Sequence, residues 1–354
     1  MEVSGVEVKG GKGKPPLLAP FLHPVKATVK VKRIALVYNP YGGKKRAQKL
    51  AETIVLPLLR AADIEVEVHT TSHAGHEAEY ARTLDLRGFD ALVGMGGDGT
   101  ISSLLSGFLS RSDAGGTALG FIPAGTGNTY VREVLGQKAA GGCESAVRAA
   151  VSVIIAGHTR RVDAFRCEMR GEDRTSPLVR HALNTVMLGF GPDANAVAER
   201  RRWLGPMRYS VSIKTEIMKL PFRKSTPCTM KLDGEATDMD LFLIALQNNK
   251  HTGIKHRIAP KALLDDGKVD VLFTSKPVRS ILKAAKLDAM ISSGGAHIHS
   301  PIVSYKTASC VEIETQGAPQ RIMLDGDIVG FTPLKLEVLP LAFSLFTPEN
   351  PAPT

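Results

Sequence analysis

Met95-Gly96-Gly97-Asp98-Gly99-Thr100 separates two segments with different hydrophobic periodicity. The apolar run before it, residues 89–94, is typical of a buried strand in a parallel sheet. In residues 101–109, which follow it, apolar side chains recur at the spacing of one helical face. A strand, a glycine-rich turn and a helix in this order direct backbone N–H groups and a helix N-terminus toward an anion. The stretch therefore predicts a phosphate-binding turn.

Asp98 is the unexpected residue in this turn. A carboxylate adds negative charge where a phosphate already carries several, so it does not help to bind the phosphate itself. An acid at this position is useful when it holds a metal ion or accepts a proton during a reaction. Asp98 is therefore a candidate catalytic residue.

The first half of the chain alternates strands with helices. We expect strands at 31–38, 64–71, 89–94 and 118–123. Helices are expected at 46–61, at 101–109 and at 145–156. Another helix is expected after the turn at 74–75 and ends near residue 84. This alternation predicts a doubly wound, three-layer α/β domain with a parallel sheet.

Three glycine-bearing turns follow strands of this sheet, at 39–44, 96–100 and 125–128. Ligands bind in such sheets at the carboxyl ends of the strands. One Gly-Gly-Asp-Gly-Thr turn alone could be an ordinary capped helix start. Three such turns in order favour a nucleotide phosphate site.

The second half, after about residue 160, is dominated by strand-like runs. They cover 161–168, 178–190, 239–247, 268–274, 302–314, 320–328 and 334–340, with helical stretches near 203–220 and 278–293. We interpret this half as a mainly antiparallel β domain with helical insertions. The expected division is a flexible basic extension at 1–30, a nucleotide-binding domain at 31–160, a β-sandwich substrate domain at 161–345 and a tail at 346–354.

Composition limits the classes of function. The chain has 354 residues, of which 43% are hydrophobic, enough for the cores of two domains of about 150 residues each. The formal charge of +10 suits anionic lipids or phosphorylated ligands,. Aromatic residues make up only 5% and no nucleic-acid-binding motif is present, so nucleic acid is not expected as a partner,. The sequence contains no candidate transmembrane segment, so any membrane contact is expected to be peripheral. The four scattered cysteines favour a reducing, cytoplasmic location.

Taken together, the motifs resemble those of the diacylglycerol, sphingosine and ceramide kinase superfamily of lipid kinases. The resemblance covers about residues 32–345. It rests on Asn-Pro-x-Gly-Gly at 39–43, Gly-Gly-Asp-Gly-Thr at 96–100, Pro-Ala-Gly-Thr-Gly-Asn at 123–128, Leu-Gly-Phe-Gly at 188–191, Trp-Leu-Gly-Pro-Met-Arg-Tyr at 203–209 and Leu-Asp-Gly-Asp at 324–327. NAD kinases and phosphofructokinases share the Gly-Gly-Asp-Gly element and the α/β fold, but not the Asn-Pro turn or the late acidic hairpin.

This resemblance implies an ATP site between the α/β domain and the β-sandwich domain. Arg202 and Arg208 match family positions that reach the phosphates from the second domain, although three consecutive arginines at 200–202 also suit a solvated basic face. The residues implied to contact ATP are Asn39, Pro40, Gly42, Gly43, Lys44, Thr71, Gly96, Gly97, Gly99, Thr100, Ser102, Gly125, Thr126, Gly127, Arg202 and Arg208.

Three acids compete for the role of general base. A lipid hydroxyl is a poor nucleophile and benefits from a carboxylate that accepts its proton. Asp98 matches the acid treated as the base in the sphingosine kinase branch. Asp325 and Asp327 match the Asp-Gly-Glu of the bacterial diacylglycerol kinase branch, with the final Glu shortened to Asp. An ordinary Asp-Gly turn is the alternative for this hairpin.

Metal and substrate positions also follow from the resemblance. The 264–268 loop resembles the family's structural magnesium loop, with Asp266 as the side-chain ligand, and a plain turn is the alternative. Asp193 and Asn195 match positions that carry acids in sphingosine-type kinases. The neutral Asn195 gives no charge to pair with an ammonium, which favours a neutral lipid alcohol over a sphingoid base. ATP and Mg²⁺ are the expected cofactors.

A further departure from the family pattern leaves an alternative open. Ser102-Ser103 stands where relatives often have Asn-Glu, which suggests altered tuning or a catalytically silent nucleotide- or lipid-binding regulator. An NAD kinase-type small-molecule kinase is the other alternative. The expected partners are ATP and a lipid at a membrane surface, and a second copy of the chain is a candidate partner. His73-x-x-His76 and His297-x-His299 have metal-like spacing but no recognised third ligand, so we expect ordinary loop and strand histidines.

Overall fold

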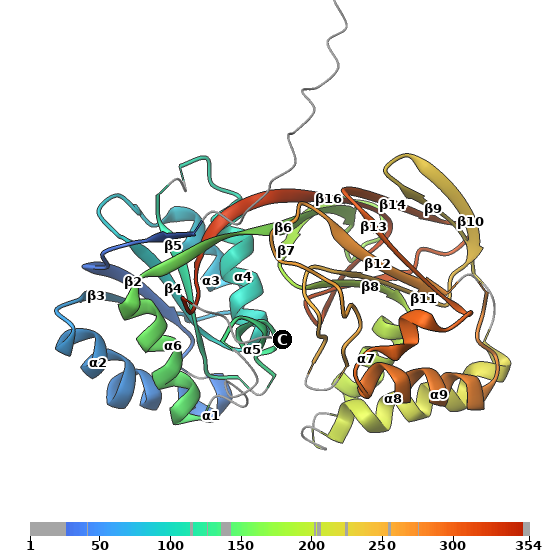
Figure 1. Ribbon diagram of the computed structural model, residues 1–354, viewed down its shortest axis with the longest axis horizontal. Coiled ribbons are helices and arrows are strands. Elements are labelled where there is room, and N and C mark those ends of the chain that lie inside the picture. Colours follow the sequence, from blue (N-terminus) through green and yellow to red (C-terminus); the bar gives the residue numbers. More distant parts are fainter. Residues whose placement is uncertain are drawn as a thin grey trace, which may run out of the picture.

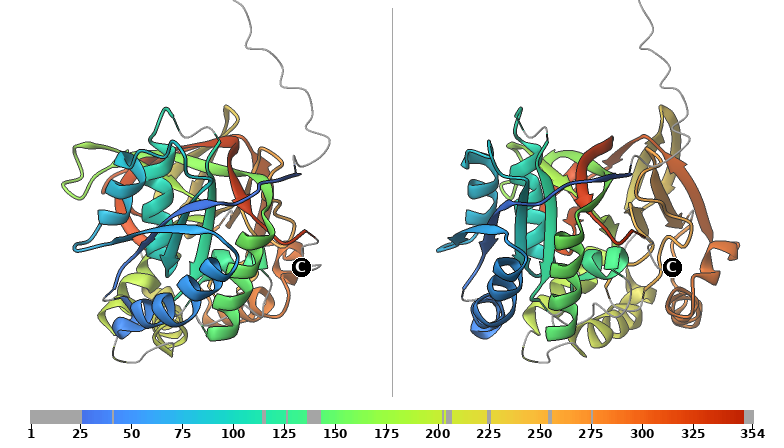
Figure 2. Two further views of the ribbon diagram at one scale, coloured as in Figure 1. Left: turned by 90° about the vertical axis from the view of Figure 1, so that its left-hand side faces the viewer. Right: turned by 60° about the vertical axis from the view of Figure 1, so that its left-hand side comes forward.

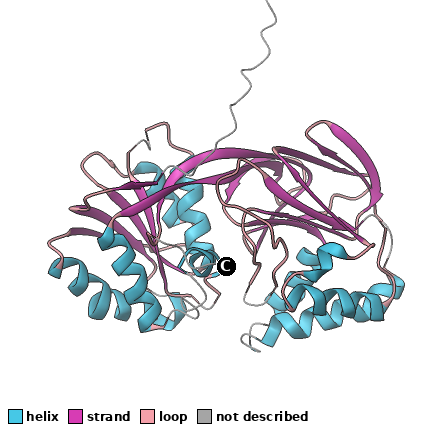
Figure 3. Cartoon of the chain, in the orientation of Figure 1, coloured by secondary structure: helices cyan, strands magenta, loops and turns pink. Residues whose placement is uncertain are grey.

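The computed structural model describes residues 26–40, 42–113, 116–125, 127–135, 143–201, 203, 207–223, 226–253, 256–274 and 276–349. These residues form two lobes that lie side by side, with long strands running from one lobe to the other (Figure 1). The N-terminal lobe is an α/β unit. The C-terminal lobe is built mainly of β-strands, with helices gathered at one end (Figure 3).

The N-terminal lobe is organised around four parallel strands in the order β3-β2-β4-β5. They are β2 (Arg33–Tyr38), β3 (Glu65–Thr70), β4 (Ala91–Gly96) and β5 (Ala118–Pro123). Both β4 and β5 are buried along their whole length. Such strands are near-continuous apolar runs because helices cover both faces of the sheet.

The helices of this lobe lie on both faces of the sheet (Figure 2). On one face are α1 (Gly42–Leu50), a π-helical turn η1 (Ala51–Val55), α2 (Leu56–Ala61) and α6 (Glu144–Ala156), packed on alternate residues of β2 and β4. On the other are α3 (His76–Thr83), α4 (Asp98–Leu109) and α5 (Thr129–Leu135). The expected doubly wound, three-layer α/β fold is confirmed.

The C-terminal lobe is a sandwich of two antiparallel sheets, which the pairing of its last two strands joins into one continuous sheet. One sheet contains β13 (Val303–Ala308), β12 (Val269–Thr274), β11 (Leu243–Gln247), β8 (Thr185–Gly189) and β15 (Arg321–Leu324). The other contains β10 (Glu235–Asp240), β9 (Pro227–Leu232), β14 (Cys310–Thr315), β16 (Asp327–Phe346), β6 (His158–Arg170) and β7 (Pro177–Ala182). Their facing side chains form one core, which includes the buried Cys167 and Cys228.

Helices cover the outer face of the first of these sheets. They are α7 (Phe190–Arg200), α8 (Met207–Lys219), a 3₁₀ turn η4 (Leu220–Phe222), α9 (Ile281–Ser292) and a 3₁₀ turn η5 (Ala296–His299). Ile217 and Leu287 pack from these helices onto Ala245 and Leu272 of the sheet. In the described ranges, no helix combines the length and apolar character that crossing a bilayer requires.

Strands β6 and β16 join the lobes. They pair with each other along most of their length, and Leu345 near the end of β16 pairs in parallel with Leu119 of β5. The short strand β1 (Lys26–Thr28), within the segment expected to be an extension, pairs with the start of β6. The mixed sheet is therefore continuous from the β-sandwich into the α/β lobe.

Several elements differ from the sequence expectations. Strand β9 was not expected, and the run 239–247 covers the end of β10 and the whole of β11 with a break between them. The run 302–314 is β13 and β14, and the run 320–328 is β15 and the start of β16.

The run 178–190 was expected as one strand, but it is β7 and β8 with a break at residues 183–184. The helix α7 begins directly after Gly189, whose φ of 80° turns the chain out of the sheet,. The helix α5 was not expected, because its seven residues are too few to show a periodic pattern,.

Candidate functional site

Four strands of the α/β lobe end at one edge of the sheet. Tyr38 of β2 is aligned with Thr70 of β3 and with Met95 of β4, and Met95 is aligned with Ile122 of β5. The residues that follow these ends therefore emerge together. Asn39, Thr71, Gly97 and Gly125 lie at this edge, as the three-turn hypothesis requires.

The second and third turns are in direct contact. A β-carbon at Gly125 would lie 2.4 Å from the Cα of Gly97, so the two backbones approach as closely as glycine allows. The N–H groups of Ala124 and Gly125 both donate to the carbonyl of Gly96, at 2.8 and 3.2 Å. The Asn128 side chain closes the third turn by accepting from the Gly125 N–H and donating to the Gly125 carbonyl. The two turns thus form one rigid unit.

Asp98 links this unit to helix α5. It is the first residue of α4, and its Oδ1 accepts a hydrogen bond of 2.7 Å from the N–H of Thr129. A β-carbon at Gly127 would lie 2.6 Å from Oδ2, so the third turn passes directly over the carboxylate. Asp98 therefore positions the turn, in addition to any chemical role.

Asp325 begins the acidic hairpin between β15 and β16. Its carboxylate accepts 2.9 Å hydrogen bonds from the N–H groups of Leu183, Asn184 and Thr185, and its own N–H donates to the Thr185 carbonyl. These contacts account for the break between β7 and β8, because the backbone there bonds to Asp325 and not to a neighbouring strand. Asp325 therefore anchors the hairpin to the sandwich.

The two lobes meet where Asp98 and Asp325 approach each other. Both line a cavity of about 10 Å³, together with Ile101, Ser102, Tyr130, Leu183 and Asn184. Burial raises the pKa of Asp98 to about 6; the Thr129 N–H opposes this effect and the nearby Asp325 carboxylate adds to it,. Burial also raises the pKa of Asp325, while the N–H groups at 183–185 and the Ser102 hydroxyl stabilise its charged form. The site therefore concentrates negative charge.

Asp327 is the most accessible of the three acids. It is an exposed residue at the start of β16. A β-carbon at Gly99 would lie 3.4 Å from its Oδ2, so the hairpin carries this carboxylate to the first turn of α4. Asp98, which precedes Asp325 and Asp327 by more than two hundred residues in sequence, thus meets them at one helix start.

The donor set at the junction fits a hard divalent cation. The Asn184 Oδ1 atom is buried and has no hydrogen-bond partner among the residues that the structure describes, and Asn184 lines the same cavity as the two carboxylates. Carboxylate and amide oxygens are the ligands that Mg²⁺ takes, and Mg²⁺ commonly retains water in its coordination shell. Asp98 and Asn184 are therefore suitable holders of magnesium. Sequence reasoning missed Asn184, because a lone asparagine carries no motif.

The two expected substrate residues lie beside the acidic hairpin. The Asn195 side chain, on α7, donates a 2.7 Å hydrogen bond to the Gly326 carbonyl. Asp193, in the first turn of α7, pairs with Arg223 at 2.5 Å and with Arg321 at 3.3 Å. The Asp193 charge is thus already balanced by two guanidinium groups.

Other expected site residues lie apart from the three acids. Arg208, at the start of α8, pairs with Glu199 at 3.1 Å and stacks on Tyr209. Asp266 is exposed in a turn, where it accepts from the Lys268 N–H. Burial raises the pKa of Asp163 to about 6, and the Asp266 carboxylate adds to this effect. The Asp266 loop is therefore a second acidic group, distinct from the junction.

Some expected contacts cannot be placed. Thr126 and Arg202 lie outside the described residues, and so does the side chain of Lys44. Pro40, Gly42 and Gly43 precede or begin α1, at the same edge as Asn39. Thr71 is buried, and its hydroxyl has no hydrogen-bond partner among the described residues. A buried hydroxyl without a partner, directly after β3, is suited to receive a polar ligand.

Comparisons with known families match both lobes. Residues 33–167 match the diacylglycerol kinase catalytic domain, and residues 184–347 match the YegS C-terminal NAD kinase beta sandwich-like domain. The chain is 29% identical over 323 residues to a diacylglycerol kinase of Mycobacterium tuberculosis, covering 90% of this chain and 96% of that protein. It is 25% identical over 316 residues to sphingosine kinase 2 of Arabidopsis thaliana, covering 77% of this chain. The chain spans 63% of the length of that plant relative.

Solved structures agree with the fold. A crystal structure from Bacillus anthracis matches with a TM-score of 0.70 and 21% identity, covering 91% of this chain and 97% of that chain. The structure of a diacylglycerol kinase from the same organism matches with a TM-score of 0.63 and 18% identity, covering 91% and 98%. The α/β lobe followed by a β-sandwich lobe is therefore the fold of these proteins.

Proposed function

Because this chain belongs to the superfamily of lipid kinases that share the diacylglycerol kinase catalytic domain, we propose that it transfers the γ-phosphoryl group of ATP to a lipid hydroxyl. The observation that carries the proposal is the meeting of Asp98, Asp325 and Asp327 at the first turn of α4, beside the two packed glycine turns. The backbone N–H groups of these turns and of the helix start suit the phosphates of ATP. The acids suit the metal ion and the attacking hydroxyl.

The environments of the three acids suggest a division of labour. Asp325 is engaged by three backbone N–H groups, and Asp98 by the Thr129 N–H. Exposed Asp327 is the best candidate general base. In the proposed step the lipid oxygen attacks the γ-phosphorus, Asp327 accepts the hydroxyl proton, and the bond from the γ-phosphorus to the ADP oxygen breaks.

Mg²⁺ is the proposed metal, and Asp98 and Asn184, which line the same cavity, are the residues that would hold it. When bound, it would neutralise charge on the phosphates and compensate the crowding of carboxylates at this junction. The Gly97 and Gly125 backbones, packed against each other, would hold the phosphate groups in place. Phosphoryl transfer depends mainly on such positioning and charge stabilisation.

We propose a neutral lipid alcohol, such as diacylglycerol or ceramide, as the substrate. A sphingoid base carries an ammonium group that needs an unpaired carboxylate. Asn195 offers none, and Asp193 already pairs with Arg223 and Arg321. Because both arginines would have to give way to an ammonium, sphingosine is expected to be the poorer substrate.

The helical end of the C-terminal lobe is suited to a membrane surface. Five large apolar side chains on or beside its helices expose most of their surface to solvent. Their exposed fractions are 82% for Trp203, 67% for Met207, 69% for Met218, 88% for Phe222 and 83% for Leu282. The cations Lys214, Lys219 and Arg223 come from the same end, seen at the lower right of Figure 1. Apolar side chains among cations bind anionic lipid surfaces. We propose that this end docks on the membrane and that α7 faces the incoming lipid.

A substrate panel tests the proposed activity. ATP consumption and phosphorylated product are measured with diacylglycerol, ceramide, sphingosine and NAD in mixed micelles, for the wild type and Asp98→Asn. We expect phosphorylation of diacylglycerol or ceramide, with a large loss in the variant. Phosphorylation of NAD alone would reject the lipid-kinase proposal. ATP binding without turnover on any substrate would identify a silent regulator.

Vesicle binding tests the docking surface separately. Trp203→Ser combined with Phe222→Ser should reduce sedimentation with anionic vesicles, since both apolar side chains are lost from the surface. Val179→Ser, an exposed apolar residue of β7, is the matched control and should bind like the wild type. Equal sedimentation of all three proteins would show that the membrane is met by another face.

A further inference from the structure

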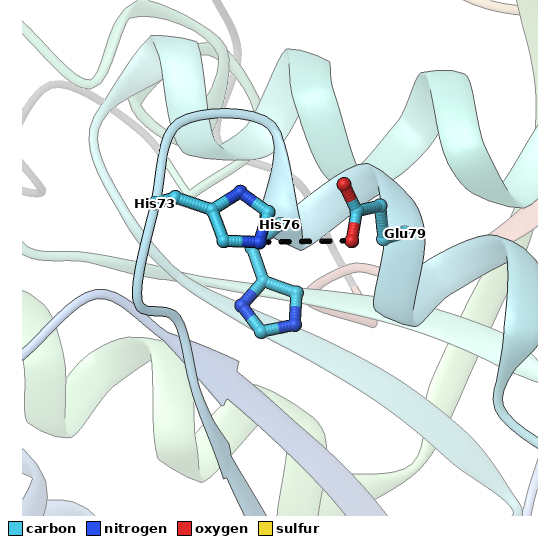
Figure 4. A group of neighbouring side chains, drawn as sticks. All are labelled: His73, His76 and Glu79. Carbon is cyan, nitrogen blue, oxygen red and sulfur yellow. Dashed lines mark ion pairs between the residues drawn. The ribbon is translucent and has the colours of Figure 1, made fainter.

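Three potential metal ligands lie together at the start of α3. His73 precedes the helix, His76 is its first residue, and Glu79 follows one turn later. Figure 4 shows Glu79 beside the two imidazole rings. One ligand atom from each residue lies within 4.8 Å of the other two, and this is the one such group of nitrogen and carboxylate ligands in the part of the chain that the structure describes. Sequence reasoning found the two histidines and missed Glu79 as the third ligand.

The spacing of the three residues explains why they converge. Residues three apart on a helix lie on the same face, and His73, His76 and Glu79 follow this spacing across the helix start. The Nε2 atom of His73 lies 3.7 Å from Glu79 Oε2, and the His73 ring stacks on that of His76 with centroids 4.4 Å apart. His73 and Glu79 are both exposed, so their side chains can adjust to a bound ion at little cost.

The surroundings of His76 supply a second layer. Its Nδ1 accepts a 3.2 Å hydrogen bond from the Ser72 N–H and also lies 3.2 Å from the Ser72 hydroxyl. A metal-bound histidine usually donates its other ring N–H to an oxygen, which fixes the tautomer and the ring orientation. Because Nδ1 accepts the Ser72 N–H in the structure, an ion on Nε2 would require this bond to break, after which the Nδ1–H of His76 would donate to the Ser72 hydroxyl. The loop thus already holds a partner for the second ring nitrogen.

We propose that His73, His76 and Glu79 form a binding site for a divalent transition-metal ion of the zinc class. Two imidazole nitrogens and one carboxylate, with the remaining position open to water, are a ligand set that Zn²⁺ accepts. Mg²⁺ and Ca²⁺ prefer oxygen ligands, so this site differs in chemistry from the acidic junction. Binding an ion would move the His73 ring away from the His76 ring. While the two rings are stacked in parallel, their nitrogen lone pairs cannot both point to one ion.

A simpler arrangement competes with this proposal. His76 also stacks on Tyr80, with centroids 4.1 Å apart, so the three rings form a column. A protonated His73 paired with Glu79 would complete that column without any ion. The two arrangements differ in the role of Glu79, because only metal binding requires both histidines and the carboxylate to act together.

The position of the site gives it a route to the nucleotide edge. Thr71 begins the same loop two residues before His73. The helix α3 packs closely on α4, where a β-carbon at Gly107 would lie 2.2 Å from the Ala78 carbonyl. An ion at the start of α3 would therefore hold the loop that follows β3. The binding measurement below does not depend on kinase activity, so its outcome is separate from that of the proposed function.

Metal titration of the full chain tests the site. Zn²⁺ binding is measured by calorimetry, and Co²⁺ binding by visible absorption, in nucleotide-free and magnesium-free buffer. We expect one tight equivalent in the wild type and a tetrahedral cobalt spectrum. Affinity should fall about tenfold or more in Glu79→Gln, and further in His73→Ala and His76→Ala, because each removes a ligand. Unfolding midpoints in chelator check that the variants fold.

Two matched controls separate the site from general surface binding. His299→Ala removes an exposed histidine and Glu172→Gln an exposed carboxylate, both outside the cluster. Both should bind like the wild type. The proposal is overturned if the wild type shows no specific equivalent, or if Glu79→Gln and His73→Ala keep wild-type affinity. It is equally overturned if the controls lose as much affinity as the cluster variants.

Discussion

Asp98 and Asp327 meet at the same helix start from opposite lobes, and their surroundings differ. Asp98 is largely enclosed, accepts the Thr129 N–H and lies under the third glycine turn. Asp327 is exposed on a hairpin that the sandwich holds in place through Asp325. An enclosed acid with fixed partners positions its neighbours, whereas an accessible acid can receive a proton from a substrate. We therefore propose that Asp98 positions its neighbours and that Asp327 accepts the proton.

Removing the charge of Asp327 should have the largest effect. Asp327→Asn keeps the shape of the side chain but cannot accept a proton, so lipid phosphorylation should fall about 1,000-fold. The measurement is phosphorylated lipid formed per minute at saturating ATP. Asp63→Asn, an exposed acid after α2 that has a positive φ of 55°, is the matched control and should keep wild-type turnover.

Removing the anchor of the hairpin should mainly reduce stability. Asp325→Ala leaves the N–H groups at 183–185 without their acceptor, and the free energy of unfolding should fall by about 3 kcal/mol. Asp325→Asn keeps one oxygen acceptor and tolerates the φ of 50° at this position, so its loss should be smaller,. Urea unfolding monitored by circular dichroism measures both. Equal stability of Asp325→Ala and the wild type would contradict the anchoring role.

The raised pKa of Asp98 should make the stability of the folded protein depend on pH. This pKa is about 6 in the folded protein and about 4 when unfolded, so the folded state binds more protons between these values,. Stability therefore falls as pH rises from about 4 to about 6, and the full penalty remains above that range. In chelator at pH 7.5, Asp98→Asn should be more stable than the wild type by about 1–2 kcal/mol.

The same comparison at low pH checks the sign of this effect. At pH 4 the Asp98 carboxyl is largely protonated in the folded wild type, so the advantage of Asp98→Asn should shrink. Thermal unfolding at both pH values is the measurement. A constant difference between the two proteins would mean that the buried charge of Asp98 is not its cause.

The smallest expected effect concerns the choice of lipid. Arg223→Met removes one of two cations that balance Asp193, so a sphingoid ammonium should compete better for that carboxylate. The ratio of kcat/KM for sphingosine to that for diacylglycerol should rise about threefold. The effect is small because a partly exposed ion pair contributes little free energy. Arg60→Met, on α2 of the other lobe, should leave the ratio unchanged.

The parallel sheet and the edge at which its glycine turns meet were predictable from sequence. Strand runs at 31–38, 89–94 and 118–123, each followed by a glycine turn, predicted both the parallel sheet and the edge where its turns meet. Local pattern suffices there, because a buried parallel strand is apolar along its length. The convergence of Asp98 with the 325–327 hairpin came from the family resemblance and not from periodicity.

Other features of the structure depend on contacts between residues that are distant in sequence. The break at 183–184 exists because Asp325 takes the N–H groups there, and no local signal marks it. The pairing of Asp193 with Arg321 depends on how α7 lies against β15. Glu79 joins His73 and His76 only once α3 is placed as a helix from His76 onward. Such features follow from the folded structure and not from any one segment.

The most direct test measures turnover and nucleotide affinity in the same protein preparations. For Asp327→Asn, kcat for lipid phosphorylation should fall about 1,000-fold while the dissociation constant for MgATP stays close to that of the wild type. For Asp98→Ala, which releases the third turn from α4, MgATP binding itself should weaken about tenfold. Wild-type turnover in Asp327→Asn, or loss of MgATP binding in that variant alone, would contradict the assignment of the proton acceptor to Asp327 and of positioning to Asp98.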